Sequence, residues 1–328
     1  MGLQQPSRRQ LQERSQKLRR RPLGSERRLE RWAKLHTVRT VTSPLADDRN
    51  AAQIAYWNGP GGERWVVHQR MQDALLAEVA ERLIERAAAR DGETVLDIGC
   101  GAGTTSIALA RQVAPDGRVL AVDVSAPLLE RARQHAPAGL PVEFALGDAT
   151  VFPFAPGGAH LLFSRFGVMF FADPARSFTN MRNGLRAGAR VVFACWQEPR
   201  HNPWLMLPLQ AAYRHVPRLP EVGPEDPGLF SFASEPRVRG ILERAGFGAI
   251  SLEPVDLSFD LADGQGLDRA VELSIGMGPT SRAFDGQPAE LRVAAAESVR
   301  AALEPYQRGD RVPLRGAIWI VTATNPQP

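Results

Sequence analysis

Cysteine is scarce in this sequence, because Cys100 and Cys195 are the only two among 328 residues. Two cysteines exclude a disulfide scaffold and any zinc or iron–sulfur site built from cysteines. The chain also lacks an apolar run near the ~20 residues that cross a bilayer. Its N-terminus has no apolar middle section of the kind found in secretory signals. We therefore expect a cytoplasmic protein without a transmembrane segment.

Lysine is nearly absent, since 38 of the 40 basic residues are arginine, and the positive charge is unevenly placed. Residues 1–50 hold 13 basic and 5 acidic residues, whereas residues 51–328 hold 27 and 31. The basic character therefore belongs to residues 1–45, which we predict to be a disordered tail ahead of a domain over 46–328. We expect no nucleic-acid partner, although a nucleic-acid modifier that uses this tail is one alternative.

Strand and helix patterns alternate through the middle of the chain. Apolar runs predict strands over 93–99, 118–124, 142–148, 159–164 and 190–196, with helices between them. Such runs, joined by helices, predict an α/β fold with a parallel sheet covered on both faces. Before them we predict a Gly-Pro-Gly-Gly turn at 59–62 and one amphipathic helix over 71–90.

The pattern loosens after residue 196. A long strand is predicted over 249–261, with a change of phase at Pro254 that indicates a bulge, and a last strand over 317–324. The stretches around them, about 197–235 and 262–310, are predicted to be cap insertions.

The clearest motif is VLDIGCGAGTTSIAL, which runs from Val95 to Leu109. A glycine loop between a strand and a helix lets a ligand approach the main chain beside the N–H groups of the helix start. A tight turn without a ligand is the alternative, but three alternate glycines exceed what a turn needs. We therefore predict a ligand site at this loop.

The spacing of the glycines distinguishes two ligands. In a dinucleotide site the third glycine of G-x-G-x-x-G would fall on residue 104, which is threonine. Here Gly103 comes one position earlier, and Asp97 precedes Gly99 by two. This D-x-G-x-G-x-G arrangement resembles the S-adenosylmethionine loop of class I methyltransferases. That ligand has no pyrophosphate, and its ammonium and sulfonium groups favour a nearby acid.

Two more acids follow predicted strands. Asp123 is placed to accept hydrogen bonds from both ribose hydroxyls, and Asp148 to accept the adenine amino group beside the N–H of Ala149. Each alone could instead be a helix N-cap. The predicted cofactor is S-adenosylmethionine, and its predicted binding residues are Asp97, Gly99, Cys100, Gly101, Gly103, Asp123, Val124, Asp148, Ala149 and Ser164.

The resemblance extends over most of residues 50–324 and is closest to the bacterial ubiquinone and menaquinone biosynthesis methyltransferases. The segments FSRFGVMFFADP and RAGARVVFACW carry the family resemblance, and Asn50 to Trp65 with HNPW at 201–204 carry the likeness to this branch. It implies a Rossmann-like, seven-stranded, mostly parallel sheet whose last two strands form an antiparallel pair. It also implies that Ser164 meets the methionine end through its carbonyl, and that Tyr56, Trp57 and Gln69 close over the ligand.

The methyl acceptor is less well defined by the sequence. His201 follows the fifth strand and is our candidate base, with a surface histidine as the alternative. Arg165 is a candidate for orienting an anionic acceptor, with a simple ion pair to an acid as the alternative. Trp196 and Trp204 are candidates for lining an aromatic pocket, with core packing as the alternative. We expect methylation, at oxygen or carbon, of a small phenol-like, quinol-like or lipid-like acceptor. A binding or scaffold protein without turnover, or a nicotinamide-dependent oxidoreductase, are the alternatives; the oligomeric state stays open.

Overall fold

The computed structural model describes residues 46–326, and the tail expected over residues 1–45 lies outside the described residues. Seven strands form one sheet in the order β3-β2-β1-β4-β5-β7-β6. Strands β1 to β5 run parallel, while β7 is antiparallel to both β5 and β6. This arrangement confirms the predicted fold class. The strands are β1 Thr94–Ile98, β2 Arg118–Asp123, β3 Val142–Leu146, β4 Ala159–Arg165, β5 Leu185–Trp196, β6 Gly248–Asp260 and β7 Pro313–Thr324.

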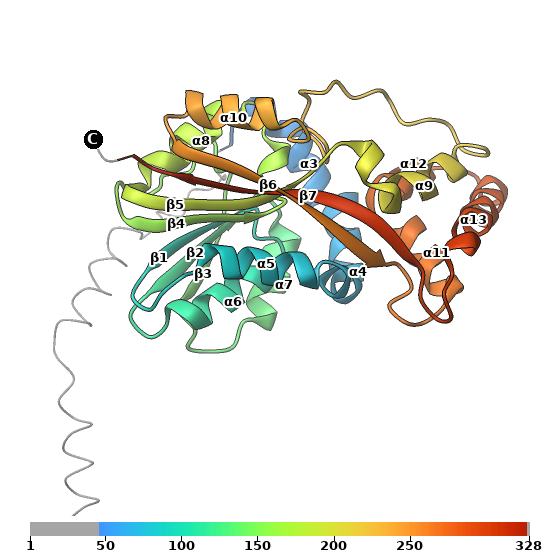
Figure 1. The fold of residues 1–328 in the computed structure, drawn as a ribbon, viewed down its shortest axis with the longest axis horizontal. Helices are drawn as coiled ribbons and strands as arrows, with labels where there is room; N and C mark the ends of the chain where they lie inside the picture. Colours follow the sequence, from blue (N-terminus) through green and yellow to red (C-terminus); the bar gives the residue numbers. More distant parts are fainter. Residues whose placement is uncertain (1–45, 327–328) are drawn as a thin grey trace, which may run out of the picture. The chain divides into compact units, whose positions relative to one another are not determined.

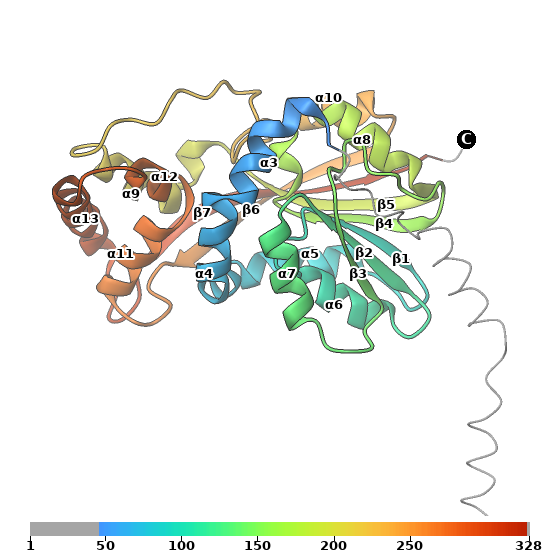
Figure 2. The ribbon, with the colours of Figure 1, turned by 180° about the vertical axis from the view of Figure 1, so that it is seen from behind.

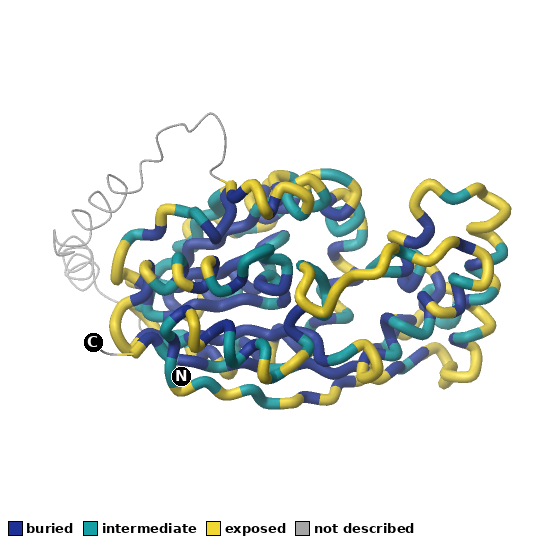
Figure 3. Tube along the Cα trace, turned by 90° about the horizontal axis from the view of Figure 1, so that it is seen from above, coloured by how far each residue is buried: buried dark blue, intermediate teal, exposed yellow. Residues whose placement is uncertain are grey.

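Helices cover both faces of the sheet (Figure 1). One face carries α5 (Ala77–Ala87), α6 (Thr104–Val113) and α7 (Ala126–His135), and the other carries α8 (Pro174–Asn183) and α10 (Glu235–Arg244). Each helix buries an apolar stripe against the strands, as Val79, Leu83 and Ala87 of α5 do at helical spacing. Figure 3 shows buried residues gathered along the strands and exposed ones along the outer turns and loops.

The segment before β1 differs from the prediction. It comprises η1 (Asp48–Asn50), α3 (Ala51–Asn58) and α4 (Pro60–Leu75). The turn predicted at 59–62 is wrong, because Pro60 stands in the first turn of α4, where proline is favoured. The single helix predicted over 71–90 is also wrong, since the chain breaks at Leu76 between α4 and α5.

The bulge predicted at Pro254 is wrong as well. Pro254 pairs with Trp319 in continuous register, and the irregularity lies between Gly248 and Ser251. In a regular strand successive side chains point to opposite faces, so Leu252 and Val255, both in the regular part of β6, face opposite sides of the sheet. The change of apolar phase therefore marks a strand that buries first one face and then the other.

Helices from two separate segments pack together beyond the end of the sheet, and we call them the cap. The cap consists of α9 (Pro203–Ala212), α11 (Leu267–Gly276), α12 (Gly278–Phe284) and α13 (Ala289–Leu303), with the short turns η3 (Pro199–His201) and η4 (Glu304–Tyr306). Helix α9 contacts α12 and α13, and α4 contacts both α7 and α11. Figure 2 shows α3 and α4 running between the sheet helices and the cap.

Membrane spans need helices that are both long and strongly apolar. No helix in the described part of the chain has both properties.

Candidate functional site

The glycine loop lies between β1 and α6, and its three glycines do different things. A Cβ on Gly99 would lie 2.5 Å from the Cα of Gly167, so this glycine permits contact between two backbones. A Cβ on Gly103 would lie 2.8 Å from the Phe144 ring, so this glycine serves helix packing. Only Gly101, with a φ of 55°, has open space where a side chain would be. The ligand-facing part of the loop is therefore centred on Gly101.

Asp97 lies directly under this loop and is fully buried. Its Oδ2 accepts hydrogen bonds from Ser106 Oγ at 2.6 Å and Thr105 Oγ1 at 3.1 Å. Its Oδ1 is buried and has no hydrogen-bond partner among the described residues. Burial raises the pKa of Asp97 to about 6, against the two hydroxyl hydrogen bonds, which lower it. An uncompensated carboxylate oxygen in such a place is suited to meeting a positive charge.

Asp123 ends β2 and faces a cavity that opens at the glycine loop. Its Oδ2 accepts a hydrogen bond from Gly101 N at 2.7 Å, and its Oδ1 accepts one from Ser125 N at 2.8 Å. Burial raises the pKa of this carboxyl, while the backbone N–H donors oppose the shift. Each carboxylate oxygen accepts more than one hydrogen bond, so both oxygens retain capacity for ligand hydroxyls.

Asp148 lines the same cavity beyond β3, but its carboxylate is already bound by the protein. Asn50 Nδ2 donates to Oδ2 at 2.7 Å, the backbone N–H of Asp47 donates to the same oxygen at 3.0 Å, and Thr150 N donates to Oδ1 at 2.8 Å. The sequence prediction had this carboxylate free for an adenine. In the structure this carboxylate instead holds the segment around Asn50 through hydrogen bonds. The sequence analysis did not predict this contact.

That segment, residues 47–58, crosses the carboxyl ends of several strands, and we call it the strap. Asn50 Oδ1 accepts from Ala172 N at 2.8 Å, beyond β4. At the other end Asn58 Nδ2 donates to Val124 O at 2.7 Å, and Ser125 Oγ donates to Trp57 O at 2.6 Å, both beyond β2. The strap thus covers the strand ends where α/β sheets of this kind bind ligands.

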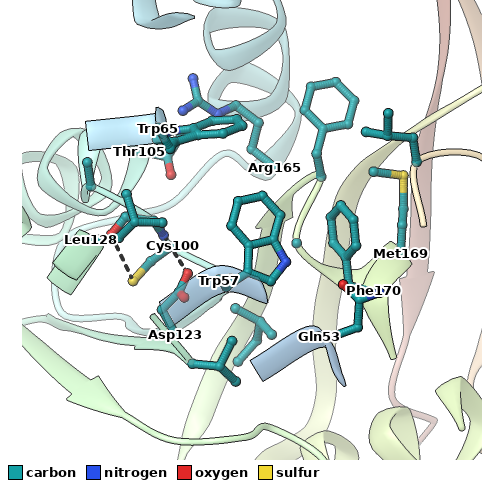
Figure 4. A pocket seen from close by; sticks show the side chains of 18 of the residues that line it. Gln53, Trp57, Trp65, Cys100, Thr105, Asp123, Leu128, Arg165, Met169 and Phe170 are labelled. Atoms are coloured by element: carbon teal, nitrogen blue, oxygen red, sulfur yellow. Dashed lines mark hydrogen bonds between the residues drawn. The ribbon is translucent and has the colours of Figure 1, made fainter. Parts of the chain in front are cut away.

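Aromatic side chains make up much of the cavity wall. The Trp57 indole contacts Phe170 edge to face, with ring centroids 5.3 Å apart. Figure 4 shows this indole between Asp123 and Cys100 on one side and Met169 and Phe170 on the other. The strap therefore supplies an aromatic wall as well as a cover.

The far part of the cavity is almost wholly apolar and reaches the cap. The ring of Phe166 stacks on Trp196, with centroids 4.1 Å apart, and Trp204 packs against Trp196 at 5.2 Å. Leu205, Leu229 and Met277 complete this chamber. Phe166 has a φ of 65°, a conformation that non-glycine residues rarely adopt and that clusters at functional sites. The cavity is thus polar beside the glycine loop and apolar beside the cap.

One ion pair interrupts the apolar wall. Arg165 Nη2 contacts Asp73 Oδ1 at 3.3 Å, and Thr104 Oγ1 donates to Asp73 Oδ2 at 2.9 Å. The Arg165 side chain is only 11% exposed, and its Nη1 is buried without a hydrogen-bond partner among the described residues. Among those residues Arg165 is the only cationic side chain that lines the cavity.

The structure brings most, but not all, of the predicted site residues together. The cavity is lined by predicted residues Trp57, Gly99, Cys100, Gly101, Asp123, Val124, Asp148, Ala149, Arg165, Trp196 and Trp204. Asp97 and Ser164 lie beneath it instead, where Ser164 Oγ donates to Ile98 O at 2.7 Å. Gly103 packs inside the fold, as described above.

Three further predicted residues lie outside the cavity wall. His201 sits exposed on η3 because that turn carries it outward, and its Nδ1 lies 3.2 Å from Gln197 Oε1. The Tyr56 ring lies under Arg282, and Gln69 Oε1 accepts from Arg131 Nε at 2.9 Å. None of the three is among the residues that line the cavity.

Several lining residues were missed. Asp73 was missed because it lay at the start of the single helix predicted over 71–90, outside its apolar face, whereas in the structure it lies near the end of α4. Phe166 and Phe170 lie in the FSRFGVMFFADP segment, whose aromatic content was a usable signal. Asn50 and Trp65 bound the segment 50–65 that carried part of the family resemblance, whereas Met277 carried no such signal, since it joins the cavity wall only in the folded chain.

Comparison with known proteins agrees with this geometry. Residues 95–188 match the family described as methyltransferase domain. A malonyl-(acyl-carrier protein) O-methyltransferase of Xylella fastidiosa is 28% identical over 153 residues, which cover 46% of this chain and 50% of the relative. A 2-phytyl-1,4-naphtoquinone methyltransferase of Trichormus variabilis is 31% identical over 125 residues, covering 37% of this chain and 55% of the relative.

A solved structure of a candidate methyltransferase from Bacillus halodurans matches with a TM-score of 0.50 and 19% identity. It covers 76% of this chain and all of its own. That match confirms the fold. The sequence matches confirm the resemblance to class I methyltransferases, naphthoquinone-methylating enzymes included, and span about half the length of those relatives.

Proposed function

We propose that this chain transfers the methyl group of S-adenosylmethionine to a small hydrophobic acceptor. The observation that carries the proposal is one continuous cavity with two chemically different ends. The end at Gly101 and Asp123 offers open backbone and a carboxylate, and the end at Trp196 and Trp204 offers apolar surface. A polar, positively charged donor and an apolar acceptor would each find a matching end.

The residues at the polar end fit S-adenosylmethionine. Gly101 leaves room for a ligand against the loop, and Asp123 has acceptor capacity for ribose hydroxyls. Asp97 Oδ1, buried and without a partner, is a place where a nearby ammonium would be stabilised. Trp57 and Phe170 provide a wall for an adenine ring, and Asp148 lines the same cavity. Bound there, the donor supplies a methyl group on a positively charged sulfur.

The protein's own contribution is alignment and exclusion of water. Holding the two reactants in contact can be worth roughly 7–11 kcal/mol of the barrier. The strap and the cap lie over the two ends of the cavity, and the aromatic side chains between them would limit the access of water to the reactants. No histidine, lysine or tyrosine lines the cavity among residues 46–326, so a proton acceptor of those types would not assist.

Thermal unfolding with separate ligands tests this proposal. At about a hundred times Kd a ligand stabilises by roughly 2.7 kcal/mol, which raises the midpoint by several degrees. We expect a rise with S-adenosylmethionine and S-adenosylhomocysteine and none with NAD or NADP. A rise with a nicotinamide cofactor alone would favour the oxidoreductase alternative.

Turnover needs a separate test, because a scaffold protein could retain the donor site. Release of S-adenosylhomocysteine in the presence of phenols, quinols or fatty acids would distinguish an enzyme from a binding protein. The same activity after removal of residues 1–45 would exclude a role for the basic tail in acceptor binding. A cytoplasmic location remains a prediction.

A further inference from the structure

Arg165 has the properties of a receptor for a negatively charged group inside the cavity. Its side chain is 11% exposed, so a charge there is largely removed from water. Asp73 contacts only Nη2, and the distance of 3.3 Å is long for an Arg–carboxylate hydrogen bond. Nη1 is left buried and unpartnered. A buried guanidinium N–H without an acceptor is costly, and a ligand oxyanion would remove that cost.

Arg165 lies between the two ends of the cavity, because Asp73, which its guanidinium contacts, also accepts a hydrogen bond from Thr104 at the start of α6. It is the last residue of β4, and the next residue, Phe166, stacks on Trp196 in the apolar chamber. The acids Asp123 and Asp148 lie beyond other strands, where they favour a cation and repel an anion. An anionic group is therefore best placed beside Arg165, with an apolar body in the chamber.

We propose that the acceptor is a hydrophobic molecule with one acidic oxygen group, a carboxylate or an acidic phenol, and that Arg165 binds this group. This inference rests on the methyltransferase function proposed above. It names an acceptor class that needs no base, because such a group already enters as an oxyanion at neutral pH. That agrees with the absence of histidine, lysine and tyrosine from the described cavity wall.

The transfer is balanced in atoms and charge. One O–C bond forms and one S–C bond breaks, the electron pair of the S–C bond stays on sulfur, and the negative oxyanion cancels the positive sulfonium. No proton moves. A carboxylate held through one oxygen at Arg165 keeps its second oxygen for the attack. The neutral ester or ether has no charge for Arg165 to hold, which favours release of the product.

A matched pair of probes tests the inference by binding alone. Isothermal titration of protein saturated with S-adenosylhomocysteine would compare 2-naphthoate with 2-naphthalenemethanol, which share a ring system and differ in charge. We expect the wild type to bind naphthoate at least tenfold more tightly. In Arg165→Gln this preference should fall to within twofold, through loss of naphthoate affinity. The exposed Arg111 of α6 provides the control, and Arg111→Gln should keep the wild-type preference.

A second variant should change naphthoate affinity in the opposite direction, and it tests the inference even if Arg165→Gln does not fold. Asp73 competes with a ligand oxyanion for Arg165, so Asp73→Asn should tighten naphthoate binding about threefold by Coulombic attraction and leave the alcohol unchanged. Weaker naphthoate binding in Asp73→Asn would overturn the inference. A wild type that binds naphthoate no better than the alcohol, or not at all, would also overturn it.

The carboxylate of the donor's methionine part is the other negatively charged group that Arg165 could bind. Titration with S-adenosylhomocysteine and with 5′-methylthioadenosine, which lacks that carboxylate, separates the two sources. A tenfold loss for the first compound alone in Arg165→Gln would assign Arg165 to the donor and overturn the acceptor class. If wild-type protein binds neither adenosyl compound, the proposed function fails, and this result is distinct from a failure of the naphthoate comparison alone.

Discussion

Gly99 and Gly167 bring the end of β1 and the segment after β4 into direct backbone contact. A Cβ on residue 99 would lie 2.5 Å from the Cα of Gly167, and one on residue 167 would lie 2.7 Å from the Cα of Gly99. Neither position can take a side chain without moving the other segment. The floor of the cavity therefore depends on two glycines, only one of which belongs to the recognisable motif.

Because of this contact, we expect two alanine substitutions in the same loop to differ, one affecting mainly stability and the other mainly ligand binding. Gly99→Ala should destabilise the fold strongly, because the new methyl group meets backbone that cannot give way. Gly101→Ala should fold at a cost of about 1–2 kcal/mol for its left-handed φ, while S-adenosylmethionine binding is lost. Urea unfolding and ligand titration of both variants would check this. Equal stability of the two proteins would contradict it.

Removing the Asp123 carboxylate should weaken donor binding. We expect Asp123→Ala to reduce affinity for S-adenosylhomocysteine by about 1–3 kcal/mol, the usual cost of a lost charged hydrogen-bond partner. Asp123→Asn should recover part of it, since the amide oxygen still accepts. Isothermal titration of the three proteins measures the difference. Unchanged affinity in Asp123→Ala would mean that the ribose lies elsewhere.

The buried Asp97 should make stability depend on pH. Its pKa is about 6 in the folded protein and 3.8 without burial, so the folded state binds the proton more tightly. The free energy of unfolding therefore falls as pH rises from about 4 to about 6, by on the order of 3 kcal/mol, and then levels off. Asp97→Asn should lack this fall. Urea unfolding at pH 4.5 and pH 7.5 would show whether the two proteins differ.

The same carboxyl should make donor affinity depend on pH in the opposite direction. Below pH 6 Asp97 is protonated and cannot stabilise the donor's ammonium group. We expect S-adenosylhomocysteine affinity to fall as pH drops from 7 to 5 in the wild type, and Asp97→Asn to be weaker and nearly flat. An identical pH profile in both proteins would place the ammonium away from Asp97.

Loosening the strap should shorten ligand residence. Asn50 is buried and bonds to Asp148, Thr150 and Ala172, so Asn50→Ala leaves several buried groups without partners. We expect faster hydrogen exchange over residues 47–58 and faster dissociation of S-adenosylhomocysteine. Asn183→Ala, at an exposed position of α8, is the matched control and should change neither. Exchange rates equal to wild type would show that Asn50 does not hold the strap.

The sequence was sufficient to predict an element and its bounds where the local residue pattern and the tertiary packing favour the same structure. Strands β1, β2 and β4 are short apolar runs buried on both sides, and their predicted bounds differ from the structure by at most one residue. It failed at Pro60 to Gly62, because strong turn formers there pack as a helix against Tyr56 and Trp57. The acids expected to bind the donor, Asp123 and Asp148, could be predicted from their positions at strand ends. The unpartnered Nη1 of Arg165 could not, because it depends on the tertiary contact in which Asp73 binds only Nη2.

Strand β6 has a consequence for how the protein unfolds. Its first half partly buries Leu252 on one face of the sheet, and its second half buries Phe259 against Trp204 of the cap. One continuous ladder with β7 joins the two halves. Helices α11, α12 and α13 of the cap lie in the chain between these two paired strands, and detaching the cap would expose the contact between Phe259 and Trp204. Residues 46–326 should melt in a single cooperative step, and damage to the acceptor chamber should lower the stability of the donor site as well.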